Sequence, residues 1–166
     1  AIFVSQGDIG AANAFFEQHR QTHADGAELN FALHAETLQT LGSIQAESVL
    51  SRGISAFPTS TRLLFARANF RERAGFFDLA EADYRQILSL NPGDANALNA
   101  LGYALTNNTD RFQEAAGLLE EAISKDPRNP AIIDSLGWVY FKLGKDRQAE
   151  LLLKEAYKQY PDPEVA

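Results

Sequence analysis

The chain has 166 residues, no cysteine, no methionine and a formal net charge of −7 at pH 7. The lack of cysteine excludes disulfides, thiolate metal sites and a cysteine nucleophile, and the acidic balance argues against nucleic acid as a partner, because that binding relies on clustered lysine and arginine. The sequence has no run of 18 apolar residues and so predicts no membrane-spanning helix.

Alanine and proline each recur at a nearly constant interval along the chain. The alanines are Ala12, Ala46, Ala80, Ala115 and Ala149, with steps of 34, 34, 35 and 34 residues. The prolines are Pro58, Pro92, Pro127 and Pro161, with steps of 34, 35 and 34 residues. Two residue types that keep one spacing predict an internal repeat. The predicted repeats form a single array over residues 1–166, at about 1–26 (partial), 27–60, 61–94, 95–129 and 130–163.

The first, partial repeat contains two of the three histidines. His19 and His23 are four residues apart, which is the spacing of two metal ligands on one helix face. A third ligand would have to come from Asp25 or Glu28. Arg20 stands where the zinc-protease motif requires glutamate. The preferred interpretation is therefore a pair of partly exposed helix residues, and we expect neither a metal nor a cofactor.

The second repeat has an ambiguous register in its first helix. Gly42 lies one place late compared with the later repeats, so either His34 or Ala35 could fill the small position. Phe31, Ala35 and Leu38 form the better apolar stripe. We therefore assign the small position to Ala35.

The third repeat follows the pattern at most positions and departs from it at two. The matching residues are Leu64, Ala68, Gly75, Ala80, Tyr84 and Pro92. Arg67 and Arg71 stand where the pattern has apolar residues.

The last two repeats are the most regular. Their first helices carry a small residue, Gly102 or Gly137, within an apolar stripe. The stripes are Leu98, Leu101 and Leu105 in one repeat, and Ile133, Leu136 and Tyr140 in the other. Because the two helices of a tight hairpin cross closely, a larger side chain at the small position would force them apart.

The ends of these helices also carry recognisable signals. Residues 107–110 form the predicted turn of the fourth repeat, with Asp110 as the expected N-cap of the next helix. Gly144 ends the first helix of the fifth repeat. The second helix of that repeat presents Ala149, Leu152, Leu153 and Ala156, and Pro161 ends it.

These residues resemble the consensus of the tetratricopeptide repeat family over nearly the whole chain, most strongly from residue 95 to residue 161. The resemblance implies an all-α solenoid of stacked antiparallel helix hairpins, with a right-handed superhelical path and about nine to ten helices. Because neither terminus shows an evident polar cap, we expect a fragment of a longer array.

In tetratricopeptide proteins the first helix of each repeat lines a concave groove. The resemblance therefore implies that the outward stripes of these helices bind a partner protein or peptide. The stripes are Arg62, Phe65 and Asn69, then Asn96, Asn99 and Tyr103, then Asp134, Trp138 and Phe141. Asparagine can both donate to and accept from a peptide backbone, and aromatic rings supply large contact areas. For Trp138 and Phe141, packing against a further repeat remains the alternative.

The segment from Ala95 to Val165 has a narrower resemblance, to tetratricopeptide lipoproteins of the proteobacterial outer membrane. It contains the runs Asn-Ala-Leu-Gly-Tyr, Asp-Ser-Leu-Gly-Trp and Pro-Asp-Pro-Glu in the same order as those proteins. The resemblance implies a periplasmic adaptor for a carboxyl-terminal processing protease and its cell-wall hydrolase substrates. It also implies that the membrane is contacted only through an N-terminal lipid outside this chain.

A pilus- or secretin-assembly lipoprotein and a cytoplasmic adaptor remain open as alternatives. An enzyme is not expected, because the glycines are scattered at helix turns instead of forming a phosphate loop. Acidic pairs such as Glu120 and Glu121 are expected on a solvated helix face and not in a catalytic pocket.

Overall fold

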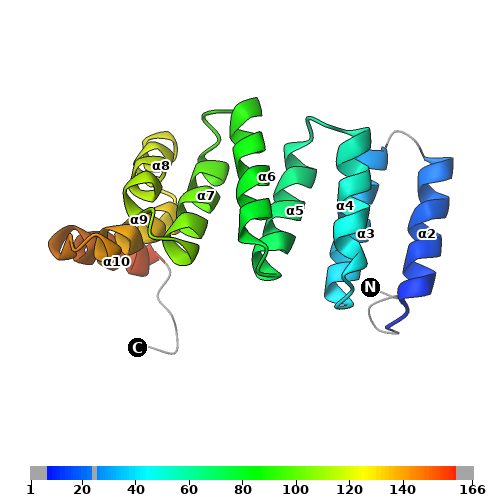
Figure 1. The fold of residues 1–166 in the computed structure, drawn as a ribbon, viewed down its shortest axis with the longest axis horizontal. Coiled ribbons are helices and arrows are strands. Elements are labelled where there is room, and N and C mark those ends of the chain that lie inside the picture. Colours follow the sequence, from blue (N-terminus) through cyan, green and yellow to red (C-terminus); the bar gives the residue numbers. More distant parts are fainter. Residues whose placement is uncertain (1–6, 24–25, 160–166) are drawn as a thin grey trace. The chain divides into compact units, whose positions relative to one another are not determined.

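The computed structural model describes residues 7–23 and 26–159, which form nine α-helices and no strand (Figure 1). The helices are α2 (Ile9–Thr22), α3 (Ala27–Thr40), α4 (Gln45–Ala56), α5 (Thr61–Arg73), α6 (Phe77–Leu90), α7 (Ala95–Asn108), α8 (Phe112–Lys125), α9 (Pro130–Lys142) and α10 (Asp146–Gln159). The all-α prediction is confirmed for this part of the chain. Asp25, Pro161 and the predicted start of the first repeat at residues 1–6 lie outside it.

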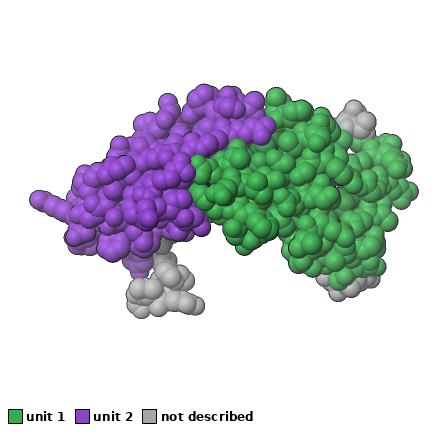
Figure 2. Space-filling model, viewed as in Figure 1, with its two compact units in different colours: residues 1–83 green, residues 84–166 purple. Residues whose placement is uncertain are grey.

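The chain forms two compact units, residues 1–83 and residues 84–166, coloured green and purple in Figure 2. We refer to them as the N-terminal unit and the C-terminal unit. Helices α2 to α5 belong to the first, helices α7 to α10 belong to the second, and the boundary falls within α6. No helix of the described residues combines the length and the apolarity that crossing a membrane requires.

The C-terminal unit consists of two helical hairpins, α7 with α8 and α9 with α10. A Cβ atom on Gly102 would lie 2.6 Å from Leu119 Cγ, and one on Gly137 would lie 2.9 Å from Leu153 Cγ. Both distances are shorter than van der Waals contact. Small residues are therefore required where the helices of each hairpin cross, as the sequence predicts.

Helix α9 also lies against both helices of the preceding hairpin. Ile132 of α9 is fully buried in a core cluster with Leu98 of α7 and Ala122 of α8. Ala95 and Ile123 pack against the same cluster. The groove between α7 and α8 is thus filled by a helix that presents one apolar face to it.

The N-terminal unit buries the apolar stripe predicted for the second repeat. Phe31 is 8% exposed, and Ala35 and Leu38 are fully buried. His34 is buried as well, but its ring contacts Asn13 of α2. The repeat alanines of both units are buried too: Ala12, Ala46, Ala80, Ala115 and Ala149.

The helix ends lie where the glycine and proline signals predict them, with one exception. Gly144 has a φ angle of +71°, the left-handed conformation that glycine adopts without strain. The exposed prolines Pro58, Pro92 and Pro127 each stand two residues after the end of a helix.

The exception is the turn of the fourth repeat, between α7 and α8. The prediction that Asp110 caps α8 is wrong, because the N-cap is Arg111 and α7 continues to Asn108. Thr109 stabilises the turn, since its hydroxyl oxygen accepts a hydrogen bond from the backbone N–H of Arg111 at 3.1 Å.

Candidate functional site

The outward side chains of α7 and α9 form the first candidate surface, in the C-terminal unit. We call Asn96, Asn99, Tyr103, Asp134, Trp138 and Phe141 the α7/α9 row. Tyr103 is 44% exposed and Phe141 is 53% exposed. Asn96 and Asp134 are exposed as well, whereas Asn99 and Trp138 are partly buried. The row therefore offers two large aromatic side chains and two polar ones to solvent.

The start of each helix in this row is fixed by a capping side chain. Asp94 Oδ1 accepts from the N–H of Ala97 at 3.0 Å at the start of α7. Asn129 Oδ1 accepts from the N–H of Ala131 at 3.1 Å at the start of α9. A cap of this kind typically contributes about 1 kcal/mol and holds the first turn in place. The first turns of the two helices that carry the row are therefore well defined.

Trp138 is held in position from three sides. Its indole Nε1 donates a hydrogen bond to Asn107 Oδ1 at 3.0 Å, which links α9 to the last turn of α7. Its ring stacks on Phe141 with 5.5 Å between the ring centroids, and Lys142 Nζ lies 4.6 Å from the Trp138 ring centroid. The indole is therefore preorganised, and Phe141 is the more accessible ring of the pair.

Asn99 is less available than the sequence suggests. Its Oδ1 atom is buried and has no hydrogen-bond partner within the described residues. A buried acceptor without a partner has a cost of about 1–3 kcal/mol, so its environment matters for stability. In this arrangement the amide does not present its oxygen to a ligand at the surface.

The predicted outward residues of the N-terminal unit lie on α5. Arg62 and Asn69 are exposed, and Phe65 is partly buried. Arg62 and Phe65 line a cavity of about 600 Å³ at the start of α5. Ser60 also lines it and donates to Glu28 Oε1 at 2.8 Å, which connects α5 to α3.

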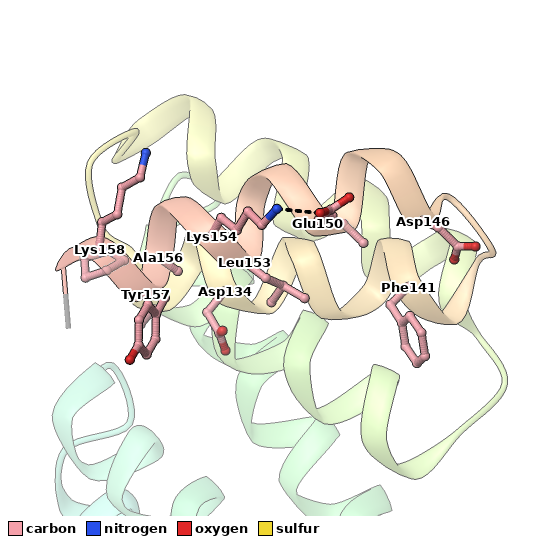
Figure 3. Close-up of a pocket in the computed structure, with 12 residues that line it drawn as sticks. Asp134, Phe141, Asp146, Glu150, Leu153, Lys154, Ala156, Tyr157 and Lys158 are labelled. Carbon is pink, nitrogen blue, oxygen red and sulfur yellow. Dashed lines mark hydrogen bonds and ion pairs between the residues drawn. The ribbon is translucent and has the colours of Figure 1, made fainter. Parts of the chain in front are cut away.

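A larger groove lies between α9 and α10 in the C-terminal unit, and the sequence did not single it out (Figure 3). Its volume is about 1090 Å³. It is lined by Pro130, Ala131, Asp134 and Phe141 of α9, and by Asp146, Ala149, Glu150, Leu153, Lys154, Ala156, Tyr157 and Lys158 of α10. Asp134 and Phe141 also belong to the α7/α9 row, so the two surfaces adjoin.

The sequence predicted some residues of this α9/α10 groove as hairpin core, and two others, Asp134 and Phe141, as outward residues of the first helix. Ala149, Leu153 and Ala156 fit the apolar face of the second helix, and Leu153 does contact Gly137. The additional signal was Tyr157, an aromatic residue directly after that apolar face. It is 45% exposed in the structure.

The two arginines that depart from the repeat pattern form an ion cluster in the N-terminal unit. Arg67 donates to both oxygens of Asp83 at 2.7 and 3.0 Å, and Arg71 Nη1 donates to Asp83 Oδ2 at 2.9 Å. Arg71 Nε donates to Glu47 Oε1 at 2.9 Å, and Arg67 Nη1 donates to Ser51 Oγ at 3.1 Å. Charged contacts thus link α4, α5 and α6 at positions where other repeats use apolar packing.

A second polar cluster surrounds His34 in the N-terminal unit. Asn13 Oδ1 can only accept, so the 2.7 Å contact means that His34 Nε2 donates and His34 Nδ1 accepts from Arg20 Nη1 at 3.3 Å. Burial, together with the positive charge of Arg20, lowers the pKa of His34 to about 4. His34 is therefore neutral at pH 7 and serves as a link between α2 and α3.

The two histidines weighed as metal ligands pack against each other. The His19 and His23 rings stack with 4.4 Å between centroids. His19 Nδ1 lies 3.1 Å from Asn30 Nδ2, and His23 Nδ1 lies 2.8 Å from the Thr22 hydroxyl oxygen. The described residues contain no group of three histidine, aspartate or glutamate side chains placed to hold a metal ion.

Comparisons with family models and with related proteins agree with the repeated helical hairpins described above. One model described as tetratricopeptide repeat matches residues 65–130, and a second with the same description matches residues 108–166. A TPR repeat-containing protein of Pseudomonas aeruginosa is 32% identical over 166 residues, which cover 99% of this chain and 28% of that protein. Bacteriophage adsorption protein A of Escherichia coli K12 is 28% identical over 137 residues, which cover 82% of this chain and 14% of that protein.

A solved structure matches the fold as well. The crystal structure of a tetratricopeptide repeat protein from Parabacteroides merdae superposes with a TM-score of 0.81 at 16% identity, covering 98% of this chain and 64% of that chain. At that identity the match concerns the fold alone. The chain spans less than a third of the length of both curated relatives.

Proposed function

Because this chain is a tetratricopeptide repeat protein, and such proteins bind other proteins, we propose that it is a non-catalytic adaptor at the periplasmic face of the outer membrane. In this role it holds a carboxyl-terminal processing protease and brings cell-wall hydrolases to it. The partners bind along the α7/α9 row.

The geometry around Trp138 is the main support for binding of a partner protein along the α7/α9 row. The indole is fixed by Asn107, and the stacked Phe141 ring is 53% exposed. Rigid aromatic side chains of this kind dominate the energetics of protein interfaces, because they bury a large area and lose little conformational entropy. The neighbouring Asp134 and Asn96 add polar groups at the rim of the row.

The envelope location is supported by sequence. Residues 95–165 resemble outer-membrane tetratricopeptide lipoproteins, and one relative is named for bacteriophage adsorption, which takes place at the cell surface. The natural full-length protein should therefore fractionate with outer membranes and incorporate labelled palmitate. Recovery in the cytoplasmic fraction without label would contradict this location and favour a cytoplasmic adaptor.

The partners are tested by affinity capture from an envelope extract. The natural protein should recover a carboxyl-terminal processing protease and at least one cell-wall hydrolase. Recovery of pilus or secretin subunits instead of these enzymes would overturn the protease assignment. The matched bait carries Tyr103→Ala and Phe141→Ala, which remove the two exposed rings of the row. It should lose both enzymes and keep its helix content by circular dichroism.

A further inference from the structure

Helix α2 is attached to the N-terminal unit with little apolar packing. Its buried residues are Ala12 and Phe16. The interface between α8 and α9 is different, because Ala122 and Ile132 are buried there in an apolar cluster. Helix α2 packs against α3, whereas α3 also packs against α4 and α5. The attachment of α2 therefore depends strongly on its polar contacts with α3.

His34 of α3 is buried by side chains of α2. Its ring is 1% exposed and stacks on Phe16, with 4.8 Å between the ring centroids. Its Nε2 donates to Asn13 Oδ1 at 2.7 Å, and its Nδ1 accepts from Arg20 Nη1 at 3.3 Å. Phe16, Asn13 and Arg20 all belong to α2. Departure of α2 would therefore remove each of these contacts and open the imidazole to water.

The charged groups that act on His34 come from α2 and α4. Arg20 and Arg52 oppose a positive charge on the imidazole, and Glu17 favours one. Glu17 lies 2.6 Å from Arg20 and 2.5 Å from Arg52, so its own charge is already paired. Helix α5 also packs against α3, but within the described part of the chain it contributes no charge to His34. The surroundings of His34 thus oppose its protonation.

A proton on His34 would disrupt the contact with Arg20. A guanidinium can only donate, so a protonated Nδ1 would place two N–H groups against each other. Burial and the charge of Arg20 together hold the pKa of His34 at about 4, whereas release from α2 would return it toward the usual 6.5. The released state therefore binds more protons between these values, and a falling pH favours it.

We propose that α2 is the moving part of an acid-sensitive switch, in which acidification detaches α2 from α3 while α3, α4 and α5 stay folded. Release would uncover the face of α3 that carries His34 and Phe31, since the Arg20 guanidinium covers the Phe31 ring at 4.5 Å from its centroid. The surface that the N-terminal unit presents to a partner then changes with pH. This inference does not depend on the proposed protease partner, because it concerns helices outside the α7/α9 row.

Hydrogen exchange of the natural full-length protein, followed by mass spectrometry and corrected for the intrinsic rate at each pH, measures the opening of each helix. Between pH 7 and pH 5 the protection factors of α2 should fall about 20-fold, the ratio that proton linkage gives for the two pKa values of His34. The protection factors of α5 should not change. Glu17 stays ionised in this range, because the hydrogen bond from Arg52 lowers its pKa.

Two other results would overturn the proposal. An equal loss of protection in α2 and α5 would mean that the whole N-terminal unit unfolds. Unchanged protection in α2 would mean that its attachment does not depend on the protonation of His34.

A matched pair of variants identifies the group that responds. His34→Gln retains an amide donor for Asn13 and cannot become charged, so the fall in α2 protection should disappear. His19→Gln is the control, because His19 Nδ1 also touches the cluster, 3.1 Å from Asn30 Nδ2, and here the fall should persist. A fall that persists in His34→Gln, or one that disappears in His19→Gln, would overturn the assignment to His34.

A third variant tests the same coupling without a change at position 34. Arg20→Gln removes the nearest opposing charge, so the folded pKa of His34 should rise and the fall in α2 protection should become smaller. An undiminished fall in this variant would contradict the role of the Arg20 contact in the switch.

Discussion

The indole nitrogen of Trp138 donates to Asn107 Oδ1 over 3.0 Å, so a single hydrogen bond joins the first helices of two successive hairpins. The same indole stacks on the exposed Phe141 ring. A contact that holds the repeats together therefore also positions the candidate binding surface, and changes at Trp138 should affect both stability and binding.

Removing the acceptor of this hydrogen bond tests how much the bond contributes to the stability of the fold. Asn107→Ala should lower the free energy of unfolding by about 1 kcal/mol, the usual net value of one hydrogen bond. Urea denaturation followed by the fluorescence of Trp138, the only tryptophan, measures it directly. The exposed Asn96→Ala serves as control and should change stability by less than about 0.5 kcal/mol. Equal effects of the two changes would show that the bond contributes nothing.

Two glycines of the C-terminal unit should respond in opposite directions to the same substitution. Gly102→Ala places a Cβ 2.6 Å from Leu119 and 3.2 Å from the Ala115 carbonyl oxygen, so we expect a loss of about 1–3 kcal/mol. Gly117→Ala meets nothing within 4 Å on α8 and should gain up to about 1 kcal/mol, because alanine favours the helix. Thermal unfolding of both variants measures the difference. A stabilising Gly102→Ala would refute close helix packing at this position.

The ion cluster should be sensitive to loss of its shared carboxylate. Asp83→Ala leaves Arg67 and Arg71 largely buried without their common partner, and we expect a loss of about 3 kcal/mol or more. Replacing all three with apolar residues, by Arg67→Leu, Arg71→Leu and Asp83→Leu together, should recover most of that loss. Chemical denaturation compares the variants. If the Asp83→Ala variant were as stable as the natural chain, solvent would be compensating the charges of Arg67 and Arg71.

The pH dependence of stability should carry the signature of His34. Its pKa is about 4 in the folded chain, because of burial and the charge of Arg20, and near 6.5 when unfolded. Between these values the unfolded state binds more protons, so the free energy of unfolding is full above pH 6.5 and falls as the pH drops toward 4. The loss should reach up to about 3 kcal/mol.

Denaturation at several pH values, with His34→Gln and the exposed His23→Gln as a matched pair, isolates this effect. Only the change at His34 should flatten the slope between pH 6.5 and 4. An unchanged slope in that variant would assign the acid sensitivity to other groups.

Recurring small residues allowed the hairpins to be predicted, since Gly102 and Gly137 are needed wherever two helices cross closely. The left-handed turn at Gly144 was predictable for the same kind of reason, because the backbone there demands one residue type. The prediction that Asp110 is the N-cap was wrong because it rested on local capping propensity alone. Helix α7 extends to Asn108, and the Thr109 hydroxyl forms the hydrogen bond that stabilises the turn.

The parts that escaped prediction depend on contacts between elements far apart in sequence. Asp83 gives no local sign of its role, and the sequence pattern showed only that Arg67 and Arg71 stand where other repeats have apolar residues. The α9/α10 groove was not predicted, because its apolar residues from α10 also satisfy the pattern of an ordinary hairpin. Which of these faces stays open is decided by packing and not by periodicity.

The most direct measurement of the central claim is the affinity of the natural full-length protein for a purified carboxyl-terminal processing protease, by titration calorimetry. Removing the exposed rings with Tyr103→Ala and Phe141→Ala should weaken binding at least tenfold, while the control Leu151→Ala, at another exposed apolar position, should leave it unchanged. Equal affinity of all three proteins, or absence of binding by the natural one, would contradict an adaptor that holds the protease along the α7/α9 row.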